Sequence, residues 1–109
     1  MTGAGEAALI WCPFPDEAAA QAAIAALLDE RAVACGNLLP GMRSFFAWQG
    51  GRDENAECGV LLKTTAAGLD GAMRRLADLH PYAEPAIMGW TVHVGAGTLA
   101  WLRAETRGA

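Results

Sequence analysis

Apolar and polar positions divide the first third of the chain into a short strand and a long helix. The run Ala7–Cys12 is apolar throughout and predicts a strand buried on both faces, ended by Pro13-Phe14-Pro15 because proline donates no hydrogen bond to a sheet ladder. Asp16 is the expected N-cap of an alanine-rich helix over about Asp16–Arg31. The apolar residues at helical spacing, which should form its buried stripe, are Ala20, Ala23, Ile24, Leu27 and Leu28.

The middle of the chain loses the helical spacing and gains aromatic residues suited to a sheet. Val33–Trp48 predicts one extended strand, bent at Pro40-Gly41. The polar stretch Gln49–Asn55 has the composition of a hairpin loop, and Cys58–Thr64 resumes as a strand. These two strands should therefore pair antiparallel.

The second half of the chain repeats the order helix, then strand, and adds a short helix. A helix is predicted over about Ala67–His80, with Pro81 closing it. The residues expected on its buried face are Leu69, Met73, Leu76 and either Leu79 or His80. The run Ile87–Val92 predicts a fourth strand, and Thr98–Thr106 predicts the short helix. The residues that share one side of that helix are Leu99, Leu102 and Trp101.

The order strand, helix, strand, strand, helix, strand predicts an α+β fold, a ferredoxin-like split βαβ sandwich with both long helices on one face of an antiparallel sheet. The other face would then be bare. Exposed apolar patches of several hundred Å² usually mark an interface, so an oligomer is expected. The aromatic residues that we expect at subunit contacts are Phe46, Trp48 and Trp90.

Composition narrows the class of protein. The 109 residues are 53% hydrophobic and predict one domain over residues 1–109, with tails only at Met1–Gly5 and Arg107–Ala109. A net charge of −4 with scattered basic residues argues against a nucleic-acid partner. No apolar stretch reaches the ~20 residues of a membrane span, and no signal peptide is recognised, so we expect a soluble, cytoplasmic protein with reduced thiols.

Several motifs in order make the chain recognisable. The segment Ala34–Gly41 is followed by Ser44, Phe46, Trp48 and Gly50, then by Leu62-Lys63-Thr64 and His80-Pro81-Tyr82. With these motifs the chain resembles the CutA family of divalent cation tolerance proteins, from about Leu9 to Trp101. The resemblance implies a ferredoxin-like subunit in a tight, cytoplasmic homotrimer, linked to tolerance of divalent metals and to copper binding, with no established catalytic reaction. It also implies an architecture similar to that of the PII signalling proteins, which bind small effectors between subunits.

The chain departs from the family pattern at four positions. Gly36 stands where the family usually has a β-branched residue, and Phe46 replaces the usual Tyr. Ala86 follows Pro85 where a Glu is typical, and Leu79 occupies a second His position before Pro81. A polar cleft site that depends on the missing phenol or carboxylate is therefore weakened.

The resemblance implies Cys12 and His80 as metal ligands, and copper suits them because Cu(I) prefers thiolate and imidazole binds either oxidation state. In the predicted sheet both residues belong to one rim, whereas Cys35 belongs to the opposite rim. Two ligands are few, so water or a neighbouring chain would have to complete the site. Other divalent cations are not excluded. The alternative is that Cys12 is a small buried apolar residue and His80 a cation at a helix end.

A second hypothesis assigns the chain a sensor role of PII type. In it a small anionic effector binds between subunits at Lys63 and Tyr82, the only lysine and the only tyrosine, and Glu57 meets a cation across the interface. A third hypothesis is a purely structural assembly hub. The usual enzymatic motifs are absent from the sequence, which favours a protein that is not an enzyme.

Overall fold

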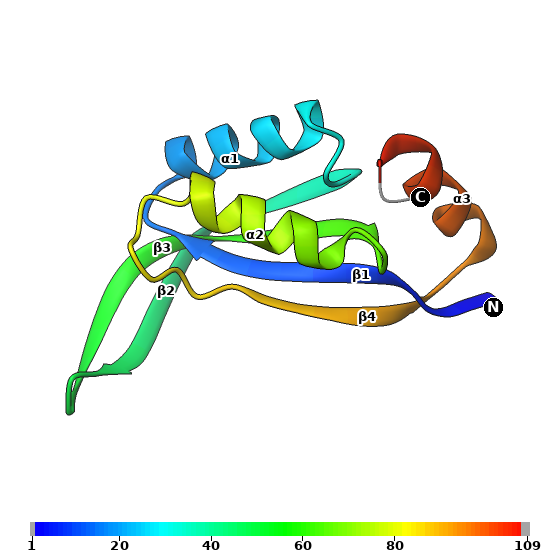
Figure 1. Cartoon of the computed structure of the whole chain (residues 1–109). Helices are drawn as coiled ribbons and strands as arrows, with labels where there is room; N and C mark the ends of the chain where they lie inside the picture. Colours follow the sequence, from blue (N-terminus) through cyan, green and yellow to red (C-terminus); the bar gives the residue numbers. More distant parts are fainter. Residues whose placement is uncertain (1, 108–109) are drawn as a thin grey trace.

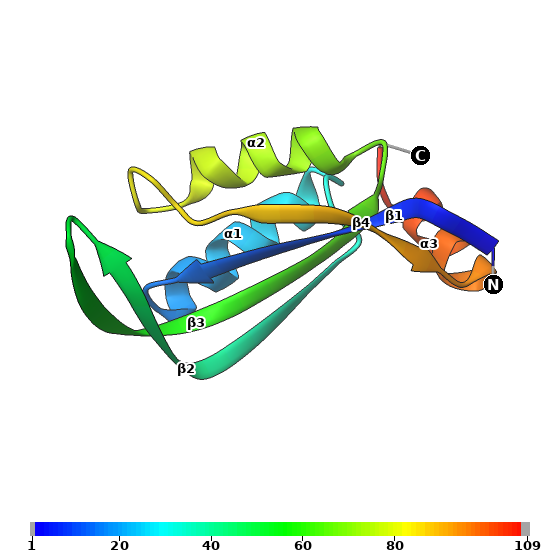
Figure 2. The same ribbon diagram turned by 90° about the horizontal axis from the view of Figure 1, so that it is seen from below.

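The computed structural model describes residues 2–107, and side chains from residue 5 onward. Seven elements follow one another: β1 Thr2–Phe14, α1 Glu17–Asp29, β2 Cys35–Trp48, β3 Gly51–Thr65, α2 Leu69–Leu79, β4 Met88–Val94 and α3 Ala96–Glu105. The four strands form one antiparallel sheet in the order β2-β3-β1-β4. Figures 1 and 2 show α1 and α2 side by side on one face of this sheet. The predicted α+β class and helix placement are confirmed. No described helix is long and apolar enough to cross a membrane.

The core lies between the sheet and the two long helices. In β1 the even positions Ile10, Cys12 and Phe14 point toward the helices and are fully buried, while Leu9 and Trp11 on the other face are half-buried. The prediction that this strand is buried on both faces is therefore wrong, because the sheet face that carries Leu9 and Trp11 is only partly covered by other elements. The other large apolar residues that are fully buried are Leu27, Val33, Val60, Leu62 and Leu76.

Strand β1 is longer than predicted at both ends. It begins at Thr2, so the prediction of a tail at Met1–Gly5 is wrong for Thr2–Gly5, which belong to the strand. Met1 and residues 108–109, which belong to the two predicted tails, lie outside the described residues. It also runs through Pro13, which pairs with Gly59 of β3. Proline is tolerated there because the pairing with β4 stops at Trp11, so no strand faces the side of Pro13 that lacks a donor.

Strands β2 and β3 extend beyond the sheet as a two-stranded ribbon, residues 42–57, which we call the arm (Figure 1). The predicted bend at Pro40-Gly41 is confirmed by a shift in strand register between Leu39 and Met42 and by the positive φ of 72° at Gly41. The predicted loop Gln49–Asn55 is too long, because only Gln49 and Gly50 form the turn. Both have positive φ, 49° and 81°, which is the backbone of a type I′ turn.

The helices differ from the prediction in two details. Leu28, expected in the buried stripe of α1, is 40% exposed, because the core contacts are made by Ala20, Ala23 and Leu27. Trp101 is 42% exposed, whereas Leu99 and Leu102 of α3 are buried against Ala7 and Val94.

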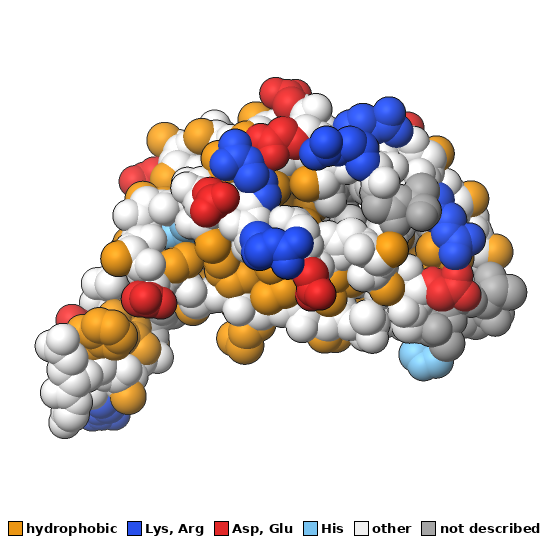
Figure 3. Space-filling model, in the orientation of Figure 1, with side chains coloured by type: hydrophobic (Ala, Val, Ile, Leu, Met, Phe, Trp, Pro, Cys, Tyr) orange, Lys and Arg blue, Asp and Glu red, His pale blue; other side chains and the backbone are white. Residues whose placement is uncertain are grey.

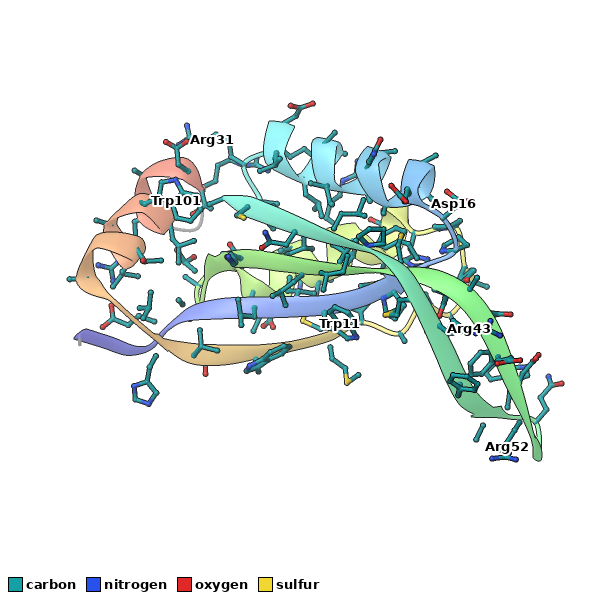
Figure 4. All side chains as sticks on the ribbon, turned by 180° about the vertical axis from the view of Figure 1, so that it is seen from behind. Trp11, Asp16, Arg31, Arg43, Arg52 and Trp101 are labelled. Atoms are coloured by element: carbon teal, nitrogen blue, oxygen red, sulfur yellow. The ribbon has the colours of Figure 1, made fainter. Side chains whose placement is uncertain are left out.

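Helix α3 covers one end of the face that was expected to be bare. Ala7 lies on the same face of β1 as Leu9 and Trp11, and Leu99 and Leu102 of α3 pack against Ala7. Arg31, just after α1, holds the helix in place by donating to the carbonyl oxygens of Ala104 at 2.6 Å and Glu105 at 3.3 Å (Figure 4). The rest of this face stays open and exposes Leu39, Met88 and Trp90, in keeping with the expectation of an uncovered apolar surface there.

Candidate functional site

Four residues that the sequence indicated lie together at the base of the arm, where β1 and α2 end: Cys12, His80, Glu57 and Tyr82. The Cys12 thiol donates to the carbonyl oxygen of Pro13 at 3.6 Å, and His80 Nε2 lies 2.8 Å from the same oxygen. The two side chains therefore converge on one atom from different elements. Pro13 cannot donate, but the structure uses its carbonyl twice, which the sequence pattern did not indicate.

His80 is held in one tautomer by its surroundings. It caps α2, and its Nδ1 accepts a hydrogen bond from the backbone N–H of Tyr82 at 3.1 Å. Since Nδ1 accepts, Nε2 carries the hydrogen and donates it to Pro13. The ring is 7% exposed and packs on Phe14, with ring centres 4.2 Å apart, and on Tyr82 at 4.9 Å. Both ring nitrogens are thus already bonded in the described structure.

Cys12 is a protonated thiol in this environment. Its side chain is fully buried, and the loss of hydration, together with the negative charge of Glu57, raises its pKa to about 12. Only the thiolate binds metals strongly, so a metal must displace this proton. Among the described residues, no three His, Cys, Asp or Glu side chains gather as a ready metal site.

Tyr82 and Glu57 form the exposed side of the same region. The Tyr82 hydroxyl donates to the Glu57 carboxylate at 2.9 Å. Desolvation, and then the hydrogen bond and charge of Glu57, raise the pKa of Tyr82 to about 12. This contact joins the segment after α2 to β3, which are 25 residues apart in the chain.

A groove of about 860 Å³, which we call the arm groove, runs between the arm and the segment after α2. The residues that line it include Phe46, Trp48, Glu57, Tyr82 and Ala86. Two of the three expected interface residues, Phe46 and Trp48, thus line the same groove as Tyr82, whereas Trp90 lies on the open sheet face. Of the four departures from the family pattern, Phe46 and Ala86 line this groove, and Leu79 packs against the core instead.

The structure does not bring Lys63 to this site within one chain. Lys63 lies six residues from Glu57 along β3, a distance of about 20 Å at ~3.4 Å per residue. It pairs with Leu9 and with Cys35, so Cys35 lies two strands away from Cys12 and is not its neighbour.

Sequence reasoning missed Cys58 as a neighbour of Cys12. Cys58 is buried and pairs with Phe14, which places it on the same face as Cys12 and diagonally across from it. Desolvation raises its pKa as well, with smaller contributions from the charges of Glu17 and Asp16. Only the register of β1 with β3 shows this proximity.

The fold and the motifs together place the chain among small α+β proteins with a four-stranded antiparallel sheet and three helices. Residues 8–105 match the family model described as CutA1 divalent ion tolerance protein. The chain therefore belongs to the CutA1 family of divalent ion tolerance proteins.

Individual relatives agree with this assignment. The divalent-cation tolerance protein CutA of Citrobacter koseri is 37% identical over 103 residues, which cover 94% of this chain and 90% of that protein. The crystal structure of CutA from Xylella fastidiosa has a TM-score of 0.87 at 36% identity, covering 92% of this chain and 97% of that one. The divalent cation tolerance protein from Thermus thermophilus has a TM-score of 0.86 at 35% identity, covering 92% and 98%.

Proposed function

We propose that this chain contributes to divalent-cation tolerance by binding a divalent metal as cargo, copper first, without catalysing a reaction. The observation that carries the proposal is the convergence of Cys12 Sγ and His80 Nε2 on the Pro13 carbonyl oxygen. One ion near that oxygen would reach a thiolate and an imidazole, the ligand pair that suits copper. Membership of a divalent ion tolerance family supports the same function.

The local contacts define how such binding would work. The metal replaces the Cys12 proton, so its affinity should rise with pH toward the thiol pKa of about 12. Binding through His80 Nε2 moves the ring proton to Nδ1 and breaks the hydrogen bond from the Tyr82 N–H. The two side chains leave coordination positions for water or for a second copy of the chain. We therefore expect weak, pH-dependent binding.

We further propose that the chain is a single ferredoxin-like domain that assembles as a cytoplasmic homotrimer. Exposed apolar side chains on two surfaces support assembly: Trp90 at 44% and Met88 at 60% on the open sheet face, and Trp48 at 59% on the arm. Large apolar side chains that gather on an exposed surface often mark an interface with another chain. Light scattering at micromolar concentration should give three times the mass of one chain, and a monomer would contradict the trimer.

Anaerobic calorimetry with Cu(II), and with Cd(II) as a divalent ion that does not oxidise thiols, tests the metal site. Cys12→Ser should abolish the binding heat of this site and the Cd–thiolate absorption, and His80→Gln should weaken both. Cys58→Ser is the matched control, because it removes another buried thiol from the same face. Equal affinity in Cys12→Ser and the parent protein would refute these ligands.

The comparisons give no support to the PII-like alternative, in which a small anion binds at Lys63 and Tyr82. Within one chain these residues are not neighbours, and the groove beside Tyr82 is lined by the carboxylates of Asp53, Glu57 and Glu84. Negative charge there disfavours an anion.

A further inference from the structure

Helix α3 is packed on the sheet by an apolar cluster of its own. The cluster joins two buried leucines of α3 to small apolar residues of the sheet and its margin: Leu99 and Leu102 with Ala7, Ala34, Val92 and Val94. Among the described residues, no member of this cluster belongs to the core between the sheet and the two long helices. Figure 1 shows α3 at the end of the sheet opposite the arm. Parts of a fold that share few contacts with the core open separately, so α3 can leave the sheet while the main core stays intact.

The C-terminal end of α3 is held by one side chain from another part of the chain. The Arg31 guanidinium donates to the carbonyl oxygens of Ala104 and Glu105, and the Arg107 N–H donates to the Arg31 carbonyl oxygen at 3.0 Å. The last four carbonyl groups of a helix lack partners within the helix, so a cation there stabilises it. In Figure 3 basic side chains gather where the end of α1 approaches α3. Residues Leu28, Arg31 and Glu105 are among those that line a hollow of about 470 Å³ here, so hydrogen bonds rather than close packing hold this end.

Arg31 occupies a backbone position that favours glycine. Its φ is 58°, and the N–H of Ala32 donates to the carbonyl oxygen of Leu27 at 2.9 Å, which closes α1 in a geometry that usually has glycine at this position. A side chain there costs free energy, because its Cβ crowds the following carbonyl oxygen. This strain belongs to the end of α1 and is the same whether α3 is docked or released. What arginine supplies, and glycine would not, is the contact with α3.

The N-terminal end of α3 is attached loosely. Gly95 is its N-cap and offers no side-chain hydrogen bond, and Gly97 lies in the first turn, where glycine weakens a helix. A Cβ at either glycine would meet no other part of the described chain within 4 Å, so this end is open on the outside. A helix of 10 residues is only marginally stable by itself in water, so a released α3 would also lose its internal hydrogen bonds.

We propose that α3 is a hinged cover that opens at Gly95, and that Arg31 is the latch that keeps it closed. The docked helix acts as an autoinhibitory contact, because it occupies apolar surface that another copy of the chain could otherwise cover. The proposed trimer is the state in which α3 is docked.

Release of α3 enlarges the open sheet face. Ala7 and Val92 pair with each other under α3, and Leu9 and Trp90 form the next pair on the same face. Uncovering the first pair therefore extends the apolar surface that already carries the second. A second copy of the chain then meets a larger apolar face, and association increases.

Hydrogen exchange of the intact protein, followed by mass spectrometry, tests the opening. Amides of α3 should exchange faster than those of α2 in the parent protein, because α3 opens without the main core. Arg31→Gly should speed exchange in α3 by at least about tenfold, since hydrogen bonds from a charged donor are lost, and should not speed exchange in α2. The urea midpoint should stay close to that of the parent protein, because glycine relieves the strain at the end of α1.

Gln49→Gly is the matched control, because Gln49 also has a positive φ, 49°, but lies in the turn of the arm. Its exchange in α3 should stay within about twofold of the parent protein, since distant sites without shared partners act independently. Light scattering at equal concentration should give a higher mean mass for Arg31→Gly than for the parent protein and for Gln49→Gly.

Two results would overturn the latch: equal exchange in α3 and α2 of the parent protein, or unchanged exchange in α3 of Arg31→Gly. Faster exchange in α3 without a higher mean mass would overturn the autoinhibitory contact. Cadmium binding by Arg31→Gly is a separate readout that tests only the metal function, because α3 holds neither Cys12 nor His80.

Discussion

Strands β2 and β3 pass through two very different regions, the body of the molecule and the arm. In the body, β3 has neighbours on both sides and helices above it, and its Val60 and Leu62 are 1% and 0% exposed. In the arm the same two strands pair only with each other, and Phe45 and Trp48 are 73% and 59% exposed. The 44 Å length of the molecule, against 26 and 23 Å in the other directions, reflects this extension.

The difference in burial indicates that the body provides most of the folding stability, whereas the arm provides surface for contacts with other molecules. The body buries apolar side chains among its own residues and supplies the folding free energy. A two-stranded ribbon is only marginally stable in water by itself, so the exposed aromatic residues of the arm gain burial only from something outside the body. The candidate site lies at the junction, where Cys12 and His80 belong to the body and Glu57 belongs to the arm.

The largest expected contrast is between two phenylalanines. Phe14→Ala removes a fully buried ring from the core and should lower the free energy of unfolding by about 3–5 kcal/mol. Phe45→Ala removes a ring that is 73% exposed and should change it by no more than about 0.5 kcal/mol. Urea unfolding of both variants measures this. A loss in Phe45→Ala close to that in Phe14→Ala would show that another copy of the chain covers the face of the arm that carries Phe45.

Glycines give the next contrast. A Cβ at Gly36 would lie 2.7 Å from Ile24 Cγ2 of α1, so Gly36→Val should cost about 1–3 kcal/mol, and Ile24→Ala in the same chain should recover part of it. A Cβ at Gly51 in the arm meets nothing closer than 3.9 Å, so Gly51→Val should not destabilise the protein. Thermal unfolding compares the two. Absence of any cost for Gly36→Val would show that the helix moves freely on the sheet.

The ion pairs of the body and of the arm can be compared by measuring how stability changes with pH. The Arg75 hydrogen bonds to Glu30, at 2.8 and 2.9 Å between α2 and α1, lower the pKa of Glu30 below its ordinary 4.5. A lowered carboxyl pKa stabilises the fold above pH 4.5, and this contribution is lost as the pH falls through the folded-state value. Arg75→Met should therefore be less stable than the parent protein at pH 7 but not in strong acid. Arg43→Met, which breaks the more exposed arm pair, should change the stability at pH 7 by less than Arg75→Met does, because exposed ion pairs contribute little.

The smallest effect concerns the single tyrosine at the junction. Ultraviolet titration should place tyrosinate formation near the Tyr82 pKa of about 12 rather than 10.0, and any stability from this shift is lost as the pH rises from 10.0 to about 12. Glu57→Gln should lower the midpoint only partly, because desolvation is the largest cause of the shift. A midpoint near 10.0 in the parent protein would mean that the contact between arm and body is open in solution.

Much of the body could be predicted from the sequence. The helix stripe with Ala20 and Leu27, the bend at Pro40-Gly41 and the antiparallel pairing of β2 with β3 follow from local periodicity and turn chemistry, and the structure has them. The arm was harder to predict, because Arg52–Asn55 are polar on both faces. Polar residues are typical of loops, but here they lie in a ladder opposite Ser44–Ala47.

The candidate site was predictable only in part. The sequence indicated all four of its main residues, but in two separate hypotheses. Cys12 and His80 were expected as metal ligands, and Glu57 and Tyr82 were expected in a cleft between subunits. Their contacts depend on where β1, β3 and the end of α2 meet, and no local pattern encodes those distances. The same holds for Cys58, whose position beside Cys12 follows from the strand register alone.

The sequence by itself determined the order and type of the elements, because periodicity, proline and glycine act over a few residues. It also determined the family, since the motifs occur in order along the chain. Only the tertiary structure decided that α3 covers one end of the second face, that the arm extends as a strand pair, and that Pro13 joins Cys12 to His80. The physical reason is that these features depend on contacts between residues far apart in the chain, and such contacts form only when the whole sheet is assembled.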